Sequence, residues 1–348
     1  MKELPRDISG LTAEWLEGAL NRSGISVKVE SLEQTRVIWG TATKVFITAE
    51  YSGKDSHKIT SKLCIKGGFD EGARNFNLGA AYELEGNFFR DIAPTLSIPL
   101  PRCFSAEVEV DQSILILEDM TERGVYFPEA QEGLGLDMVS KALEVMASWQ
   151  ASAWGTKAPQ YDWLPVGCRA VRQALDTLLT DELFFDLTGR DIIPALPERL
   201  QDPALVRSAY HQLWADADQA ELTLSHGDAH VGQTYIDNQS NPAFLDWQGV
   251  CLAPWASDVA YFIGGALSPE VRRENERDLL RHYIDTLASR GGPLLDEEMA
   301  WLEYRKHTLH GFVWALTPLN LQPEPVVTEL ARRYLEVIAD HRPETLLT

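Results

Sequence analysis

The spacing of apolar residues changes near residue 120, and this change constrains the fold more than any other feature. Before it, short segments alternate apolar and polar residues, as strands with one buried face do. In the segment 43–51, for example, Val45, Ile47 and Ala49 share one face. After it, apolar residues recur at helical spacing, as in residues 136–154. The chain is therefore expected to have a β-rich first part and a larger, mainly helical second part.

The boundaries of the expected elements follow from glycine, proline and other turn residues. We predict a small antiparallel sheet with one helix packed on it, a short connector, and a helical region with one embedded hairpin. In residue numbers, the first part covers 1–117, the connector 118–122 and the helical part 123–348. The expected strands lie from about 32 and at 43–51, 59–68, 103–110 and 113–120. The expected helices lie at 11–22, 78–93 and 136–154, and helical patterns dominate 169–218 and 270–340.

The charge composition bears on the partners of the protein. The chain of 348 residues has 52 acidic and 31 basic residues, which gives a net charge of −21. Such a surface repels the phosphates of nucleic acids and anionic lipids. We therefore expect neither nucleic acid nor membrane as a partner. An ATP site would need its own lysine and metal ion to offset the negative background.

The cysteines and the N-terminus indicate the compartment. The four cysteines, Cys64, Cys103, Cys168 and Cys251, form no C-x-x-C pair, so the spacing indicates neither a zinc site nor a redox motif. Cysteines dispersed in this way suggest a reducing cytoplasm. The N-terminus has no apolar run of signal-peptide length, and no later window could span a membrane. The expected location is cytoplasmic, and the oligomeric state is left open.

The segment LSHGDAHVGQTYI, residues 224–236, concentrates polar residues between two strand-like pieces. TYID and AFL, which follow around the turn NQSNP, predict a hairpin. Gln233 and Asp246 would then lie at the same end of the hairpin, roughly 5 Å apart. The loop that carries Asp228 is expected at that end too. Three side chains with oxygen atoms gathered in this way suit a hard cation such as Mg²⁺.

Two other interpretations of this segment compete. An aspartate in a loop with glycines is often only a solvated turn residue. His226-x-Asp228-x-His230 also has the alternating pattern of zinc ligands in metal-dependent hydrolases. Alternate residues converge only on a strand, however, and Gly227 and Gly232 argue against a strand. No further cluster of histidine or cysteine completes a zinc shell, so the convergence of oxygen atoms favours the Mg²⁺ interpretation.

Seven motifs in the right order give the chain a specific resemblance. From about residue 10 to residue 265, it resembles the aminoglycoside phosphotransferase, choline kinase and ecdysteroid-kinase-like superfamily. HGDAHVGQ is similar to the catalytic loop H-G-D-x-x-x-x-N of that superfamily, and LDWQ to its metal-binding motif. The other motifs are CIKGG, YELEGNFF, LILEDM, MASWQASAW and SDVAYF. The resemblance implies an α+β, protein-kinase-like fold of two lobes, with ATP bound between a β-rich N-lobe and a larger helical C-lobe.

The resemblance also implies roles for individual residues. Asp228 would position and deprotonate the acceptor hydroxyl, and Asp246 would bind Mg²⁺. Lys66 would bind the α- and β-phosphates of ATP, with Glu85 as its ion-pair partner. Glu83 competes with Glu85 for this pairing. The remaining contacts to ATP would come from the phosphate-covering loop and the hinge: Gly40, Thr41, Thr43, Glu118 and Met120. The histidines of the catalytic loop, His226 and His230, would support it.

One departure from the superfamily pattern concerns catalysis. Gln233 stands where the superfamily usually has asparagine. Glutamine keeps the amide oxygen but is longer by one methylene group. It could bind Mg²⁺ with a shifted backbone, or it could leave Asp246 as the remaining metal ligand and weaken or abolish catalysis.

The sequence therefore predicts an ATP-dependent kinase that phosphorylates a hydroxyl group of a small metabolite or an antibiotic-like molecule. The alternatives are a kinase-fold protein that binds nucleotide or ligand without turnover, and a metal-dependent phosphoesterase. The acceptor is expected against the helices of the second part, but its identity cannot be read from the sequence. An aminoglycoside would require an acidic pocket. The tryptophans that could line a pocket or belong to the core are Trp154, Trp163, Trp255, Trp301 and Trp314.

Overall fold

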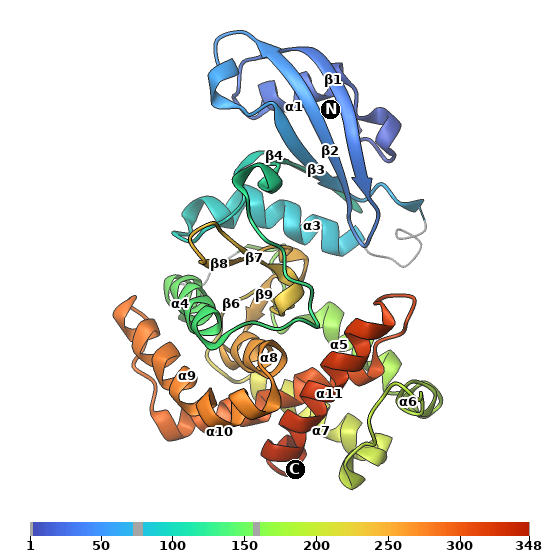
Figure 1. Cartoon of the computed structure of the whole chain (residues 1–348), viewed down its shortest axis with the longest axis vertical. Coiled ribbons are helices and arrows are strands. Elements are labelled where there is room, and N and C mark those ends of the chain that lie inside the picture. The colour runs from blue at the N-terminus through green and yellow to red at the C-terminus, as the bar shows by residue number, and fades with distance from the viewer. Residues whose placement is uncertain (1–2, 72–78, 156–160, 348) are drawn as a thin grey trace. The chain divides into compact units, whose positions relative to one another are not determined.

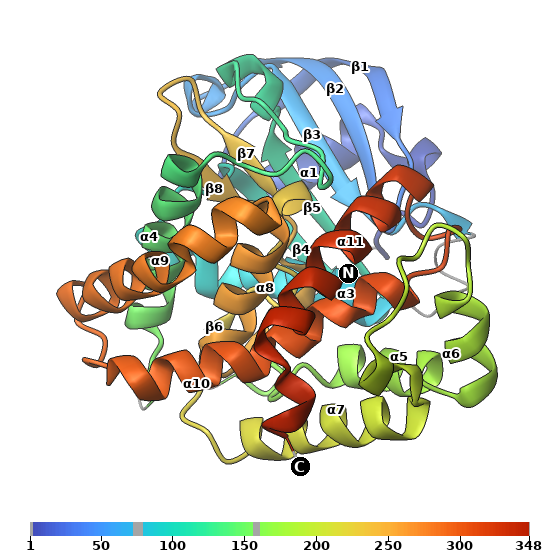
Figure 2. The same cartoon turned by 60° about the horizontal axis from the view of Figure 1, so that its bottom comes forward.

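The computed structural model describes residues 3–71, 79–155 and 161–347 (Figure 1 and Figure 2). Contacts within the chain divide it into two units. The sheet unit consists of Met1–Tyr126 together with the short segment Leu245–Gln248. The helical unit consists of Phe127–Phe244 and Gly249–Thr348. The boundaries of the predicted connector are thus not those of the contact division, which falls after Tyr126.

The sheet unit contains a five-stranded antiparallel sheet in the order β1-β2-β3-β5-β4. Its central strand β3 pairs Lys66 with Lys44 on one side and with Leu115 on the other. Residues Leu63 to Gly67 of β3 are all buried, because both faces of the strand are covered. The strands are β1 (Lys28–Ile38), β2 (Thr43–Ser52), β3 (Lys62–Gly67), β4 (Cys103–Glu109) and β5 (Gln112–Glu118).

In the part of the unit that the structure describes, helices α1 and α3 accompany this sheet. Helix α1 (Ala13–Arg22) begins at Thr12, whose side chain accepts a hydrogen bond from the Trp15 amide. Helix α3 (Gly79–Asn87) continues into a π-helical turn, η3 (Phe88–Ile92), so the helix predicted over 78–93 is regular only in its first part, and Leu78 lies outside the described residues. Short 3₁₀ segments are η1 (Ile8–Gly10), η2 (Ser56–Lys58), η4 (Ala93–Thr95) and η5 (Met120–Arg123). The core against α1 includes Leu16, Leu20, Val45, Ile47, Leu63, Ile65, Ile114 and Ile116.

The helical unit contains helices of varied length and two small antiparallel strand pairs, β6 with β9 and β7 with β8. Its helices are α4 (Leu136–Ser152), α5 (Arg169–Leu178), α6 (Asp181–Thr188), α7 (Pro203–Ala217), α8 (Ala256–Ala266), α9 (Pro269–Ser289), α10 (Glu297–His307) and α11 (Glu324–His341). Its 3₁₀ segments are η7 (Glu198–Gln201), η8 (Val231–Gln233), η10 (Thr308–Leu316) and η11 (Pro343–Thr345), with η9 (Trp247–Gly249) at the boundary between the units. Its strands are β6 (Thr223–Ser225), β7 (Thr234–Ile236), β8 (Pro242–Phe244) and β9 (Cys251–Ala253).

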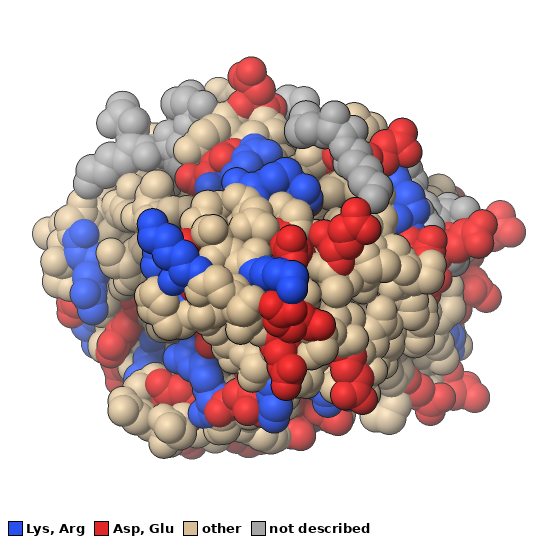
Figure 3. Space-filling view, turned by 90° about the horizontal axis from the view of Figure 1, so that it is seen from above, with Lys and Arg blue, Asp and Glu red and all other residues tan. Residues whose placement is uncertain are grey.

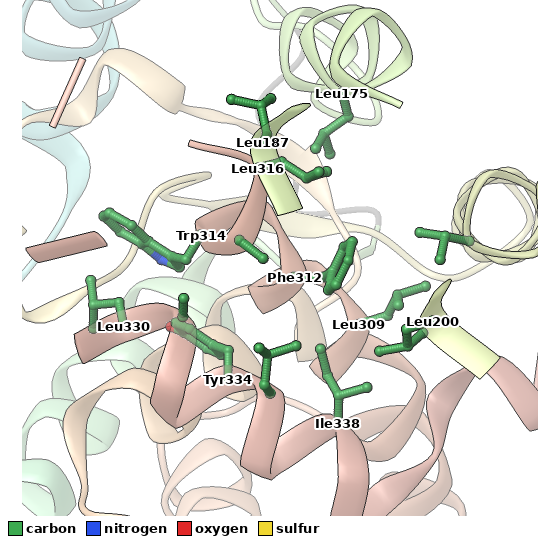
Figure 4. Close-up of a cluster of buried hydrophobic side chains, with 14 of the residues drawn as sticks. Leu175, Leu187, Leu200, Leu309, Phe312, Trp314, Leu316, Leu330, Tyr334 and Ile338 are labelled. Carbon is green, nitrogen blue, oxygen red and sulfur yellow. The ribbon is translucent and has the colours of Figure 1, made fainter. Parts of the chain in front are cut away.

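A large apolar cluster holds the helical unit together (Figure 4). Phe312 and Leu309 of η10 lie among side chains of α11 and of the α5–α7 region. Burying one such side chain stabilises the fold by about 1.5–3 kcal/mol. Gly311 is required here, because a Cβ atom at this position would lie 1.9 Å from the ring of Tyr334. Trp314, one of the five tryptophans considered for a pocket, belongs to this cluster.

A disulfide joins Cys168 to Cys251 across a sequence separation of 83 residues. It reinforces the backbone hydrogen bonds that Leu252 exchanges with Pro165 and Gly167, each 2.8 Å long. The segment before α5 is thereby fastened to β9. The spacing of the cysteines gave no sign of this pair, and a disulfide counts against the reducing compartment that the spacing suggested. Cys64 and Cys103 carry free thiols.

The described residues form no helix with the length and apolar character needed to cross a membrane. On the face shown in Figure 3, basic side chains are interspersed with acidic ones. The excess of acidic residues in the sequence is thus distributed over a mixed surface on this side.

Candidate active site

The polar segment 226–233 forms a loop after β6 that one buried carboxylate holds in place. Asp258, in the first turn of α8, accepts hydrogen bonds from the amides of His226 at 2.8 Å and Gly227 at 3.1 Å. It also accepts one from the Ser225 hydroxyl at 2.9 Å. Burial raises the pKa of Asp258, while the neighbouring His226 and the three donors favour its charged form. The path of the loop is therefore set by a helix that follows it by thirty residues or so in the chain.

The tight turn of the loop depends on Gly227. Its φ is 80°, in the left-handed region that glycine adopts without strain. A Cβ atom there would lie 2.0 Å from the carbonyl oxygen of Gly249. Both the backbone angle and the close approach to the turn after Trp247 exclude a side chain at this position.

Asp228 follows this turn, and the loop holds one end of its carboxylate. Oδ2 accepts a hydrogen bond from the Gln233 amide nitrogen at 3.1 Å and lies 3.7 Å from Nε2 of His230. The backbone amide of Asp228 donates to Nδ1 of His226 at 3.3 Å. The side chain is 46% exposed, and no hydrogen bond to Oδ1 is found among residues 3–71, 79–155 and 161–347. One oxygen is thus oriented, and the other is accessible.

The two histidines of the loop are buried and their Nδ1 atoms are engaged. His226 is fully buried, and its Nδ1 accepts the Asp228 amide. Nδ1 of His230 accepts the amide of Gly232, where a Cβ atom would lie 2.8 Å from the imidazole. The described part of the chain contains no group of three or more His, Cys, Asp and Glu residues that could hold a metal ion. This arrangement fits histidines that shape the loop better than alternating zinc ligands.

A second constellation lies in the sheet unit, where a lysine is buried between two carboxylates. Nζ of Lys66 is 2.7 Å from Glu85 and 2.9 Å from Oδ1 of Asp246. The side chains of Lys66 and Glu85 are each only 4% exposed. Burial alone would lower the pKa of Lys66, but the charges of Asp246 and Glu85 raise it above its usual value. Glu83 does not compete for the lysine, because its carboxylate accepts the amide of Asp111 at 2.9 Å.

The backbone around Asp246 is unusual and firmly anchored. Asp246 has a φ of 63°, which few residues other than glycine adopt and which aspartate tolerates better than most. The next residue, Trp247, stacks on Phe88 of the π-helical turn, with ring centroids 4.2 Å apart and planes at 7°. This stacking fixes the short segment that presents the Asp246 carboxylate to Lys66.

The residues predicted to cover the phosphates differ in their exposure. Gly40 and Thr41 are exposed in the turn between β1 and β2, where the Tyr82 hydroxyl donates to the Thr41 carbonyl at 2.6 Å. Thr43 begins β2, and its hydroxyl is buried without a hydrogen-bond partner among the described residues. A side chain at Gly40 would meet no atom closer than 3.7 Å. The turn therefore does not require glycine, unlike the turn at Gly227.

The predicted hinge residues lie at the end of β5. The amide of Glu118 donates to the Arg102 carbonyl at 2.9 Å, and its carboxylate accepts the Arg102 amide at 2.7 Å. Met120 is buried and is the first residue of η5, where a backbone N–H is not used by the helical turn itself. Such an N–H is free to bind an acceptor that lies outside the turn.

The predicted site residues thus form two groups. Asp228 and Gln233 are joined in the helical unit, and Lys66, Glu85 and Asp246 are joined in the sheet unit. Since each group belongs to its own unit, the convergence of all three oxygen-bearing residues at the end of the hairpin stays a prediction. The hairpin itself is present, with Thr234 paired to Phe244.

The carboxylate and amide oxygens of these side chains are of the types that bind Mg²⁺. Gln233 uses its amide nitrogen toward Asp228, so its amide oxygen points to the other side of the group. Asp246 uses Oδ1 toward Lys66 and has a second carboxylate oxygen. One carboxylate and one amide oxygen, completed by phosphate and water, form a common Mg²⁺ environment.

Sequence reasoning missed Asp258 as a site residue. Its signal is a single carboxylate in an otherwise apolar helix, within the segment SDVAYF. A buried charge of this kind requires donors, and the loop amides supply them. Sequence reasoning also missed a pocket in the helical unit, whose lining includes Trp214 and none of the five tryptophans considered above.

Solved structures with the same fold are kinases and phosphotransferases. Choline kinase from Streptococcus pneumoniae is 14% identical, with a TM-score of 0.51 over 94% of this chain and 98% of that one. The aminoglycoside phosphotransferase APH(2″)-IIIa, in a complex with GDP and kanamycin, is 10% identical, with a TM-score of 0.51 over 94% of this chain and 99% of that one. These similarities confirm the predicted α+β, protein-kinase-like fold.

No curated protein matches the sequence. The sequence profile of the ecdysteroid kinase-like family, in contrast, matches residues 42–164 and 190–291, which is more than half of the chain. The matched residues include Lys66, Glu85, Asp228 and Asp246, the residues on which the resemblance was based. The chain therefore belongs to the ecdysteroid kinase-like family.

Proposed function

We propose that the protein is an ATP-dependent kinase that transfers the γ-phosphate to a hydroxyl group of a small molecule. The observation that carries this proposal is Lys66, buried between Glu85 and Asp246. Burying three charged groups together is costly and seldom improves stability over apolar packing. A lysine held in this way is oriented to bind phosphate oxygens, which is its role in phosphoryl transfer.

We assign nucleotide binding to residues of the sheet unit. Lys66 would bind the α- and β-phosphates while Glu85 keeps its ammonium in position. The backbone of Glu118 and Met120 would contact adenine, and the turn with Gly40 and Thr41 would cover the phosphates. The buried hydroxyl of Thr43 is less suited to this task. When bound, Mg²⁺ would be held by Asp246 and Gln233 and would neutralise charge on the phosphates.

We assign the contact with the acceptor hydroxyl to Asp228. Its Oδ2 is oriented by Gln233, and Oδ1 is accessible to an incoming hydroxyl. As the hydroxyl oxygen bonds to the γ-phosphorus, the bond to the β-phosphate oxygen breaks and the hydroxyl proton passes to Asp228. Positioning supplies most of the acceleration in such a reaction, so the carboxylate need not be strongly basic.

The solved structures that share this fold support the proposal that the protein binds a nucleotide. Structures of the choline kinase with AMP and of the aminoglycoside phosphotransferase with GDP share the fold of this chain. Their ligands differ in the base, so the test must compare ATP with GTP. A cytoplasmic location would provide these nucleotides, and the Cys168–Cys251 disulfide would then be an exception to the usual state of cytosolic thiols.

One observation also supports the second candidate, a protein that binds nucleotide or ligand without turnover. Gln233 replaces the usual asparagine at the residue that orients Asp228. If the longer side chain misplaces its amide oxygen, nucleotide would bind and phosphoryl transfer would fail. No comparable observation favours a phosphoesterase.

The experiment has two stages on the full chain. Melting temperature is first measured with Mg-ATP, Mg-GTP and ATP plus a chelator, because a ligand that binds the native state stabilises it. We expect a rise with Mg-ATP and a smaller rise without the metal. ADP release is then measured against a library of hydroxylated metabolites. Folded protein that does not respond to millimolar Mg-ATP would rule out both the kinase and the nucleotide-binding protein.

A further inference from the structure

The face of the sheet that carries Lys66 also carries a second lysine. Lys44 of β2 and Lys66 of β3 are directly paired across the two antiparallel strands. Residues paired in this way project to the same face of a sheet, with their Cβ atoms roughly 5 Å apart. The opposite face is apolar, because the next pair, Val45 with Ile65, belongs to the core against α1. Lys44 is therefore a cross-strand neighbour of Lys66 on the face away from α1.

Lys44 differs from Lys66 in burial and in partners. Lys44 is half-buried, whereas the side chain of Lys66 is only 4% exposed. No hydrogen bond or ion pair of the Lys44 ammonium is found among the residues that the structure describes. Burial raises the pKa of Glu85, and the charges of Lys66 and Lys44 oppose this shift. The ammonium of Lys44 is thus close enough to influence the carboxylate that holds Lys66.

The charges around Lys66 favour a further cation when a polyanion binds. Lys66 is shared by Glu85 and Asp246, which lie 2.7 and 2.9 Å from its Nζ. With both carboxylates ionised, one positive and two negative charges give this group a net charge of −1. A nucleotide adds the charge of its phosphates, of which Mg²⁺ neutralises only a part. Lys44 stands at the adjoining position of the sheet and can supply the missing positive charge.

The next row of the sheet adds a third basic side chain to this face. Arg36 of β1 is paired with Phe46 of β2, and its guanidinium carbon lies 3.9 Å from the centre of the phenyl ring. Phe46 and Lys44 are two residues apart in β2, so they project to the same face. Within a chain of net charge −21, basic residues of three neighbouring strands thus gather on one face. Such a local positive potential attracts anions.

Lys44 also follows closely on the turn between β1 and β2, which is predicted to cover the phosphates. The Tyr82 hydroxyl donates to the Thr41 carbonyl of this turn at 2.6 Å. Tyr82 belongs to α3, the helix that also carries Glu85. The turn and the ion-pair partner of Lys66 are therefore held by one helix. Phosphates covered by this turn would lie within reach of the Lys44 ammonium.

We propose that Lys44 is a second phosphate-binding residue, which contacts the phosphates of the bound nucleotide beside Lys66. The proposal rests on the proposed function and adds to it a residue of β2. Because Lys44 contacts the phosphates and not the nucleoside, it contributes to the binding of nucleotides and of inorganic polyphosphate. It contributes nothing to the binding of adenosine.

Three probes test this role on the full chain: Mg-ATP, inorganic tripolyphosphate with Mg²⁺, and adenosine. The variant Lys44→Met keeps the apolar stem of the side chain and removes its charge. Its affinity for Mg-ATP and for tripolyphosphate should fall by about tenfold or more, the weight of one hydrogen bond to a charged group. Its affinity for adenosine should not change. Calorimetric titration measures the first two and ligand-observed NMR the third, and an equal loss for all three probes would overturn the proposal.

Further variants assign the effect to the charge at this position. Lys44→Arg keeps the positive charge and should recover most of the affinity for Mg-ATP. Lys44→Gln takes the place of the methionine variant if the latter does not fold. The matched control is Lys28→Met, since Lys28 lies in β1 of the same sheet, is 66% exposed and pairs with Glu30 at 2.7 Å. A loss of the same size in Lys28→Met would trace the effect to net charge and would contradict a specific role of Lys44.

The same titrations separate this proposal from the proposed function. If wild type and Lys44→Met bind Mg-ATP equally well, the role of Lys44 is wrong and the proposed kinase activity stands. If folded wild type binds neither Mg-ATP nor tripolyphosphate, both proposals fail. Tripolyphosphate that binds through Lys44 without any binding of Mg-ATP would overturn the nucleotide role together with the proposed function.

Discussion

Gln233 donates a hydrogen bond from its amide nitrogen to Oδ2 of Asp228 at 3.1 Å. The longer side chain thus still reaches the carboxylate that it has to orient. The amide oxygen, on the other side of the same group, is the atom proposed to bind Mg²⁺. This single contact links the departure from the superfamily pattern to the two functions proposed for Gln233.

The first prediction concerns Gln233. The variant Gln233→Asn keeps both amide atoms and should retain much of the phosphoryl transfer activity. Gln233→Leu keeps neither and should lose activity, by about tenfold or more, because Asp228 loses its orienting donor. Steady-state ADP release measures both. Gln212→Leu, on the exposed face of α7, is the control, and equal activity of Gln233→Leu and wild type would show that Gln233 has neither role.

The second prediction separates the proposed roles of Asp228 as the catalytic base and Asp246 as a metal ligand. Asp228→Asn should bind Mg-ATP nearly as wild type does and turn over roughly 10²–10⁴ times more slowly, since one positioned acid–base group is lost. Asp246→Asn should weaken metal-dependent nucleotide binding as well, because its carboxylate is the one near Lys66. Calorimetric titration of Mg-ATP beside single-turnover phosphorylation compares them. Wild-type turnover in Asp228→Asn would contradict the assignment of the base.

The third prediction concerns the buried lysine. Lys66→Met leaves Glu85 and Asp246 without their shared cation, so the free energy of unfolding should fall by about 3–5 kcal/mol. The double variant Lys66→Met/Glu85→Gln removes one of the stranded charges and should recover part of this loss. Urea unfolding measures the stability of each protein. If the single variant is as stable as wild type, the two carboxylates do not depend on the lysine.

The fourth prediction is a pH dependence from His310. Its pKa is about 4 in the folded protein and about 6.5 when unfolded, so the unfolded chain binds more protons between these values. The stabilisation is complete above about pH 6.5 and is lost as the pH falls toward 4, by roughly 3 kcal/mol for the full interval. His310→Gln should flatten the dependence of stability on pH between 7 and 5. A parallel loss in wild type and His310→Gln would exclude His310 as the cause.

The fifth prediction concerns the Cys168–Cys251 disulfide. Closing a loop of 83 residues should stabilise the native state by about 4–5 kcal/mol in the chain-entropy treatment. Dithiothreitol should therefore lower the free energy of unfolding of wild type and have no effect on Cys168→Ala/Cys251→Ala. Thiol counting by mass spectrometry gives an independent check, with two reactive thiols expected in the unfolded, unreduced protein. Four would show that the bond does not form.

The features that the sequence predicts well are those carried by local patterns. Alternation in 43–51 and the segment SILILEDM at 113–120 predict strands that are present as β2 and β5, and the turn NQSNP predicts the hairpin of β7 and β8. The spacing of Lys66 and Glu85, together with the aromatic pair that follows Glu85, favours Glu85 over Glu83 as the partner of the lysine.

The features that sequence reasoning missed depend on contacts between distant segments. Cys168 and Cys251 are 83 residues apart, and no local rule pairs them. Asp258 looks like an ordinary first-turn acid of a helix until the loop amides are brought to it. The wall of the pocket combines α7, α8 and α10, so neither His307 nor Trp214 has any signal of its own in the sequence.

Asp258 anchors the loop that we propose to be catalytic, which would couple activity to packing far from the reaction. Helix α8 is buried except at Ser257, and Tyr334 of α11 donates a hydrogen bond to the backbone of α8 at Tyr261. A change that lets α8 shift within the core therefore moves Asp258, and the loop amides move with it. Substitutions at Gly311, against the ring of Tyr334, should slow turnover under conditions where the protein is still fully folded. The packing of the core would thus keep the proposed catalytic loop in position. Selection for activity would then act on core residues that do not contact the substrate.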